Sequence, residues 1–204
     1  MFEKKYNALI ARSFNSKLDV YLFNELSTTG EIKVVDEQKF LKFSVSKQIA
    51  DQYEDSWQRD EINGIPAKDF DKKVESWYKG NLDLIKKVLT AYEIQFKFDF
   101  PISEFMEFYK EREEERVCFY CKTTEAEILK LRGSGLIKTK RNRGKQMEID
   151  RKNSNMEYSK DNVVLACYWC NNAKTDEFTM EEFEAVGKEI RKIWNNRLSK
   201  INSL

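Results

Sequence analysis

Three stretches of the chain decide the fold: Cys118-Phe-Tyr-Cys121, Met147-Glu-Ile-Asp-Arg151, and Asn162-Val-Val-Leu-Ala-Cys167-Tyr-Trp-Cys170-Asn171-Asn-Ala-Lys174. Each Cys-x-x-Cys pair bends the backbone so that two thiolates converge, and two such pairs complete a tetrahedral site for one metal ion. We therefore predict a structural Zn²⁺ bound by all four cysteines, namely Cys118, Cys121, Cys167 and Cys170. The alternatives are two disulfides or unrelated buried cysteines, and a reducing cytosol disfavours the disulfides.

The bulk composition is that of a soluble globular protein. With 204 residues, the chain can form one sizeable domain, or one domain and a small module. The N-terminal stretch Met1–Tyr6 lacks the apolar core of a secretory signal, and the aliphatic run Val163–Ala166 is far too short to span a bilayer. We expect a cytoplasmic protein that has no membrane segment.

Basic residues are concentrated in one part of the chain. Between Val117 and Thr175 there are twelve Lys and Arg against six Asp and Glu, whereas residues 1–116 carry nineteen against twenty-three. A basic module of this kind is typical of a polyanion-binding surface, and chance clustering of solvated lysines is the alternative. Histidine is absent, so any chemistry has to work without imidazole as a base or as a metal ligand.

Residues 1–100 are predicted to form a mainly helical N-terminal region for sequence recognition, dimerisation or partner binding. Apolar residues recur at roughly helical spacing within 36–57 and again within 70–89, with a break at 64–66. Apolar and polar residues alternate strictly over 94–100, which predicts a short strand or an extended arm that a proline ends.

Residues 101–204 are predicted to form a second domain, in which helices are mixed with short strands. Ser103 is expected to cap a helix that runs to about Arg116. The capping-box pattern Thr124–Glu127 predicts a further helix that ends at Gly133-Ser-Gly135.

The remainder of this domain is predicted to be a strand at 147–151, a segment 162–167 that leads into a helix, and a final helix that the capping box Thr179–Glu182 begins. The final helix is expected to pack on the core through apolar residues at heptad-like spacing, which are Phe183, Val186, Ile190, Ile193 and Trp194. The predicted fold class is α+β and predominantly helical.

Asp150 ends the predicted strand, and Asn171 follows Cys170 at the start of the predicted helix. A carboxylate and an amide oxygen form a hard site with few ligands, which Mg²⁺ tolerates because it keeps waters and uses substrate phosphate oxygens. Taken singly, each residue is better explained by a structural role.

Together these motifs resemble the HNH endonuclease family in its zinc-containing form, and the likeness covers roughly 117–174, under a third of the chain. The resemblance implies a ββα-metal module. It also implies that the substrate is double-stranded DNA. It implies that Asp150 and Asn171 bind a catalytic Mg²⁺ or Mn²⁺, and that Asn162 fixes the loop between the strands by hydrogen bonds. It also implies that the Zn²⁺ on the cysteines is structural.

Arg151 departs from the pattern of most family members, which have histidine there as the general base. Arginine cannot deprotonate water, but it can bind the scissile phosphate bidentately. A restriction-endonuclease branch of the family also carries Asp-Arg, so the resemblance is compatible with activity. The base is then a water molecule, Tyr158, Tyr120 or Lys174; loss of catalysis is the alternative.

Further DNA contacts are expected from a basic loop and from Lys174, one helical turn beyond Asn171. The basic loop spans positions 138–145 and carries Lys138, Lys140, Arg141, Arg143 and Lys145, whose phosphate contacts would supply non-specific affinity. A solvated loop is the alternative. Tyr168 and Trp169 either stack on bases or pack in the protein.

The sequence therefore favours a metal-dependent DNA endonuclease that acts in restriction or in a phage or mobile element. A palindromic target would call for a homodimer. The alternative is a catalytically inactive, zinc-stabilised nucleic-acid-binding module, which the missing histidine favours. A third function, a zinc-dependent protein-interaction adaptor, has no support from the basic loop.

Overall fold

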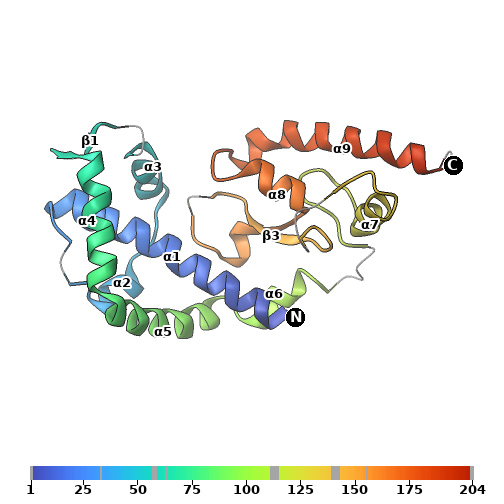
Figure 1. The fold of residues 1–204 in the computed structure, drawn as a ribbon. Helices are drawn as coiled ribbons and strands as arrows, with labels where there is room; N and C mark the ends of the chain where they lie inside the picture. Colours follow the sequence, from blue (N-terminus) through green and yellow to red (C-terminus); the bar gives the residue numbers. More distant parts are fainter. Residues whose placement is uncertain are drawn as a thin grey trace. The chain divides into compact units, whose positions relative to one another are not determined.

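A computed structural model describes residues 2–32, 34–56, 59–62, 64–110, 115–138, 143–154 and 156–202 of the chain. The chain divides into two compact units, of which the first comprises residues 1–102 and 155–159 and the second comprises residues 103–154 and 160–204. Figure 1 shows the course of the chain through both units. Among the described residues, no helix is both long and apolar enough to cross a membrane.

The first unit is built around one long helix. Its elements are, in chain order, α1 (Phe2–Thr29), α2 (Glu37–Lys42), α3 (Lys47–Ser56), β1 (Glu61–Ile62), β2 (Ile65–Pro66), α4 (Ala67–Gly80) and α5 (Leu82–Asp99). Helix α1 packs against α3, α4 and α5 (Figure 1). Its buried face is aliphatic and aromatic and includes Leu9, Phe14, Leu18, Leu22 and Leu26. The predicted helical N-terminal region is confirmed.

The predicted strand over 94–100 is wrong, because residues 94–99 complete α5 and Phe100 is its C-cap. Phe96 and Phe100 are buried and continue the row of Val88 and Tyr92 at a spacing of four residues, as a helix requires. The residues that made the pattern look alternating, Ile94 and Phe98, are 70% and 85% exposed. Every second residue is apolar in this segment, but only every fourth one is buried.

The second unit is a ββα module with helices on either side of it in the sequence. Its elements are α6 (Ile102–Glu107), α7 (Glu125–Gly133), β3 (Glu148–Arg151), the 3₁₀ helix η2 (Lys160–Asn162), β4 (Val163–Ala166), α8 (Tyr168–Lys174) and α9 (Met180–Asn202). Strands β3 and β4 are antiparallel and pair Glu148 with Ala166 and Asp150 with Val164. Helix α8 packs on β3, and α9 packs on α7 and α8. The predicted α+β fold class is confirmed.

The helix predicted from Ser103 to Arg116 is shorter than expected, and Ser103 lies inside it. Helix α6 ends at Glu107, and Tyr109 N–H bonds to the carbonyl of Met106, a tight turn that ends the helix. Tyr109 is buried, and its hydroxyl donates to the carbonyl of Met147 at 3.4 Å. This packing holds Tyr109 against the segment before β3, and residues 111–114 of the predicted helix lie outside the described part.

The final helix packs on the core as predicted, through three of the five expected residues. Phe183 and Trp194 are 0% and 6% exposed, and Ile190 packs beside them. Val186 and Ile193 are 37% and 48% exposed, so their assignment to the buried face was wrong. The buried stripe follows positions 183, 187, 190 and 194, which brings the backbone at Gly187 to the interface.

Candidate metal centre and active site

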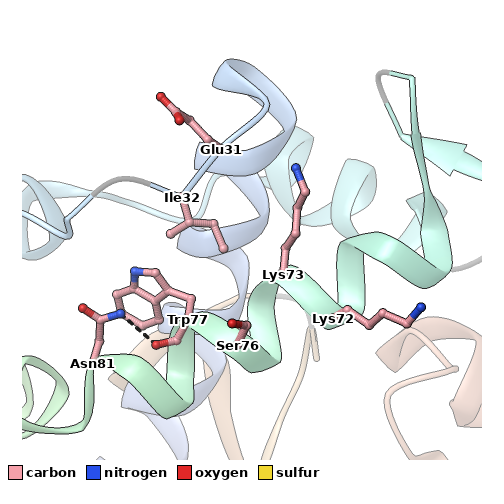
Figure 2. Close-up of a pocket in the computed structure, with 7 residues that line it drawn as sticks. All are labelled: Glu31, Ile32, Lys72, Lys73, Ser76, Trp77 and Asn81. Carbon is pink, nitrogen blue, oxygen red and sulfur yellow. Dashed lines mark hydrogen bonds between the residues drawn. The ribbon is translucent and has the colours of Figure 1, made fainter.

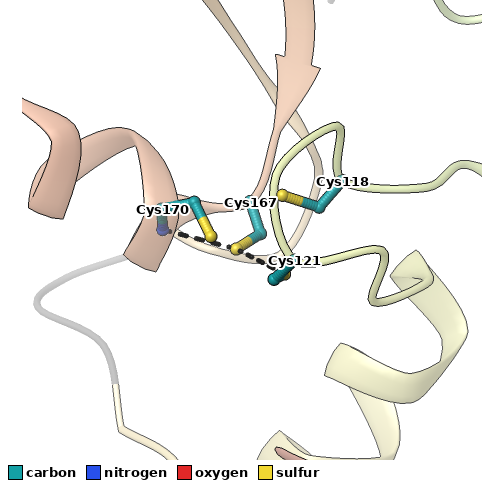
Figure 3. Close-up of side chains that lie close together, drawn as sticks. All are labelled: Cys118, Cys121, Cys167 and Cys170. Atoms are coloured by element: carbon teal, nitrogen blue, oxygen red, sulfur yellow. Dashed lines mark hydrogen bonds between the residues drawn. The ribbon is translucent and has the colours of Figure 1, made fainter. Parts of the chain in front are cut away.

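The four cysteines meet at one point in the second unit (Figure 3). All are free and buried, their sulfur atoms lie within 4.8 Å of one another, and the Sγ atoms of Cys121 and Cys167 are 3.8 Å apart. A disulfide would need a sulfur–sulfur distance of about 2.05 Å. Tetrahedral Zn–S bonds of about 2.3 Å place sulfur atoms about 3.8 Å apart. The cluster is therefore positioned to hold one metal ion and fits Zn²⁺.

Local backbone geometry shapes each cysteine pair. In the first knuckle, Cys118 donates its N–H to Thr123 and accepts from Lys122, whose φ of +57° closes the turn. In the second, Cys167 caps α8, and its sulfur accepts the N–H of Cys170 at 3.4 Å. The first knuckle is also joined to β4, because Phe119 N–H bonds to the carbonyl of Leu165 at 2.8 Å. The cysteine cluster and this hydrogen bond thus join the two knuckles and the hairpin into one clamped scaffold.

Asp150 lies on β3 and is held by a tyrosine of the first knuckle. The hydroxyl of Tyr120 donates to Oδ2 of Asp150 at 2.7 Å. Burial raises the pKa of Asp150, although this donor and the nearby Lys174 ammonium act in the opposite direction. Burial and the Asp150 carboxylate together raise the pKa of Tyr120 well above its ordinary value. The phenol therefore keeps its proton and serves as the donor.

Asn171 is held by a residue that the sequence analysis did not assign to the site. Its Nδ2 donates to Oε2 of Glu148 at 2.7 Å. Glu148 precedes Asp150 by two residues on β3, so both carboxylates lie on the same face of the strand. This bond ties Asn171 to the face that carries Asp150 and leaves the amide oxygen, Oδ1, as the atom that can bind a cation. The alternation of side chains along a strand could have indicated from the sequence that Glu148 shares a face with Asp150.

Arg143 also contacts Glu148. Its guanidinium donates to the two carboxylate oxygens at 3.2 and 2.8 Å and to Oδ1 of Asn172 at 3.4 Å, and it lies over the ring of Tyr168 at 4.7 Å. Trp169 packs edge-on against Trp194, with ring centroids 5.4 Å apart. Both knuckle aromatics thus have partners within the protein.

Arg151 follows Asp150 on β3, and Asn162 lies just before β4. Arg151 donates to Asp176 at 3.4 Å, and the Asp176 side chain is 82% exposed. The amide of Asn162 both accepts the N–H of Asn153 and donates to its carbonyl, each at 3.0 Å. Asn162 therefore fastens the chain after β3 to the start of β4.

Lys174 does not lie where a phosphate contact would need it. It is 0% exposed, and its ammonium donates to Oγ of Ser154 at 2.8 Å. Burial lowers the pKa of Lys174, and Asp150 opposes that shift. The expected surface role of Lys174 is thus replaced by an internal one beside Asp150.

The basic loop is described in part. Lys138, Arg143 and Lys145 are exposed, while Lys140 and Arg141 lie outside the described residues. Tyr158, one of the candidate bases, belongs to the first unit, where the guanidinium of Arg12 lies 5.9 Å from its ring centroid. Tyr120 and Lys174, two other candidate bases, belong to the second unit and lie near Asp150.

The first unit contains a separate cavity of about 550 Å³, shown in Figure 2. Its lining mixes both charges and includes Glu31, Lys73 and Trp77. The ammonium of Lys73 donates to the carbonyl of Gly30 at 3.2 Å. This cavity contains none of the predicted site residues.

Comparisons with known proteins gave one similar solved structure. A scan of protein-family models and a search of curated proteins found no match. Among solved structures, the chain is similar to an HNH restriction endonuclease. That enzyme is the rare-cutting PacI, for which a mechanism of DNA perturbation is described. The match has 30% identity and a TM-score of 0.42 and covers 48% of this chain.

The chain spans 66% of the length of PacI. PacI is an HNH enzyme, and the motifs of residues 117–174 resemble that family. A TM-score of 0.42 describes a partial likeness.

Proposed function

We propose that the chain is a divalent-cation-dependent DNA endonuclease of the HNH type. One observation carries the proposal: Glu148, on the same strand face as Asp150, holds the amide of Asn171 at 2.7 Å. This arrangement puts a carboxylate and an amide oxygen on neighbouring elements of a clamped ββα module. We propose that its substrate is double-stranded DNA.

Asp150 and Asn171 are the residues that would hold the cation. They fit it because a carboxylate and an amide oxygen are ligands that Mg²⁺ and Mn²⁺ accept, with water and phosphate oxygens completing the shell. Such an ion stabilises negative charge that develops on a phosphodiester during hydrolysis. The protein contributes the fixed placement of the two ligands, through Tyr120 on one side and Glu148 on the other.

Arg151 would bind the scissile phosphate. Its pair with Asp176 is long at 3.4 Å, and although the Arg151 side chain is only 11% exposed, its partner is 82% exposed, so water screens the partner's charge. A phosphate can therefore replace Asp176 and gain two parallel N–H···O bonds from the guanidinium. Arg151 adds positive charge where the transition state becomes more negative.

The basic loop would supply the sequence-independent affinity for DNA. Lys138, Arg143 and Lys145 are exposed on the second unit, and each phosphate contact releases counterions. Restriction, or a role in a phage or mobile element, is the proposed setting. A homodimer is proposed for a palindromic target, and the cysteine-bound ion is proposed to be structural Zn²⁺.

Plasmid nicking in Mg²⁺ or Mn²⁺ tests this function. The wild type should nick the plasmid, and Asp150→Ala and Asn171→Ala should not. Asp161→Ala, an exposed aspartate of the same unit, is the matched control and should retain activity. Nicking that survives Asp150→Ala would refute the site. DNA binding without nicking by the wild type would favour the zinc-stabilised binding module, the function that the missing histidine supports.

A further inference from the structure

Helix α9 lies outside the motifs that resemble the HNH family, yet its backbone touches the tyrosine that holds Asp150. A Cβ atom built on Gly187 would lie 2.9 Å from the carbonyl oxygen of Tyr120 and 3.2 Å from its Cβ. Side chains essentially never approach backbone so closely. Only glycine allows α9 to lie this near the first knuckle.

Nothing in the helix itself calls for glycine at this position. Gly187 lies well inside the 23-residue helix α9, where glycine is among the least favourable residues. Its φ is not positive, unlike that of Gly135 at +74°. Close packing against Tyr120 is therefore the physical reason for the residue. At Gly133, by contrast, an added Cβ would meet nothing within 4 Å.

The same face of α9 also fixes the ring of Tyr120. Phe183, one turn before Gly187 and 0% exposed, packs edge-on against that ring with centroids 5.2 Å apart and an interplanar angle of 85°. One turn after Gly187, Arg191 forms a two-pronged ion pair with Glu127 at 2.6 and 3.0 Å, which secures α9 against α7. Two turns of α9 thus contact Tyr120, and the next turn holds the helix in place against α7.

We infer that Gly187 and Phe183 are positioning residues, which set the place of Asp150 through the hydroxyl of Tyr120. The inference rests on the proposed function, since it concerns the cation ligand of that site. The chain of contacts is continuous. Helix α9 touches the backbone and ring of Tyr120, and the Tyr120 hydroxyl bonds to Oδ2 of Asp150 at 2.7 Å. Helix α9 is then part of the catalytic scaffold and more than a cover for the core.

The size of the effect follows from the distances. Relieving a 2.9 Å contact to the ordinary 3.4 Å requires a shift of about 0.5 Å. A shift of that size along the hydrogen bond lengthens it from 2.7 Å to about 3.2 Å, beyond the range of O–H···O bonds. Since a misplacement of about 1 Å can lower a rate about 100-fold, half that displacement predicts a loss of about tenfold.

A double-mutant cycle between Gly187→Ala and Tyr120→Phe tests the inference. The readouts are Mn²⁺ affinity, by calorimetry, and plasmid cleavage, with zinc content and thermal melting measured alongside. Gly187→Ala should weaken Mn²⁺ binding and cleavage about tenfold in the wild-type background and have little effect in the Tyr120→Phe background. A purely structural role would produce the same loss in both backgrounds. Gly133→Ala, the matched glycine in α7, should be silent.

Phe183→Leu provides a second route in case the alanine variant does not fold. It removes the ring contact without adding a backbone clash, and its effect should likewise depend on the Tyr120 hydroxyl. An active wild type with a fully folded Gly187→Ala variant of unchanged affinity and activity would overturn the inference and leave the proposed function standing. A wild type that neither binds Mn²⁺ nor cleaves DNA would overturn both.

Discussion

Replacing Glu148 with alanine should weaken binding of the catalytic cation although Glu148 is not assigned as a ligand. Glu148 accepts the Nδ2 hydrogen bond of Asn171 at 2.7 Å and so fixes which atom of the amide is presented. A hydrogen bond to a charged group contributes about 1.5–3 kcal/mol. Removing such an outer partner of a metal ligand typically lowers metal affinity about 10–100-fold. The two estimates agree, because about 1.4 kcal/mol corresponds to a factor of ten.

Calorimetric titration of the wild type and Glu148→Ala with Mn²⁺ measures this effect. Arg143→Ala is the matched control, since it removes the other partner of Glu148, at 2.8 Å, and leaves the bond to Asn171 in place. The control should bind Mn²⁺ with almost unchanged affinity and bind DNA more weakly. Equal Mn²⁺ affinity in the wild type and Glu148→Ala would refute the reasoning about Asn171.

Three further predictions concern the scaffold and the DNA contacts. Glu125→Gln should lower the free energy of unfolding of the second unit by about 3 kcal/mol in urea, because breaking a buried ion pair is costly. Glu125 and its partner Arg116 are 1% and 5% exposed. A change below about 1 kcal/mol would argue against the pair. Burial raises the pKa of Glu127, but hydrogen bonds from Arg191 outweigh it and lower that pKa below 4.5. The ionised Glu127 therefore contributes stability above pH 4.5, and this contribution is lost as the pH falls through the lowered pKa. Unfolding curves between pH 3 and 7 should therefore show a shallower acid dependence for Glu127→Gln, and identical curves would contradict the assignment. Neutralising the basic residues of 138–145 should flatten the salt dependence of DNA binding, and an unchanged salt slope would remove the loop from the interface.

Local patterns allowed several parts of the fold to be predicted from sequence. The capping box at Thr124 forms, with both of its reciprocal hydrogen bonds present. The two cysteine knuckles converge because their spacing dictates the turn. These features depend on residues within a few positions of one another, so the sequence alone contains the information.

The predictions that were wrong or incomplete concern features that depend on which distant segments pack together. The alternation over 94–100 did not show that only Phe96 and Phe100 would face α1 and its neighbours. Lys174 read as a surface cation, but the packing of α8 on β3 buries it beside Ser154. Glu148 and Gly187 could be assigned only once their partners, Asn171 and the carbonyl of Tyr120, were known.

The central claim is that Asp150 and Asn171 share one divalent cation. The most direct measurement is a crystal structure with Mn²⁺, in which anomalous scattering locates the ion independently of the protein atoms. We predict one peak within about 2.0–2.3 Å of both a carboxylate oxygen of Asp150 and Oδ1 of Asn171. A fully occupied Mn²⁺ site elsewhere, or a peak that touches Asp150 while Asn171 points away, would contradict the account.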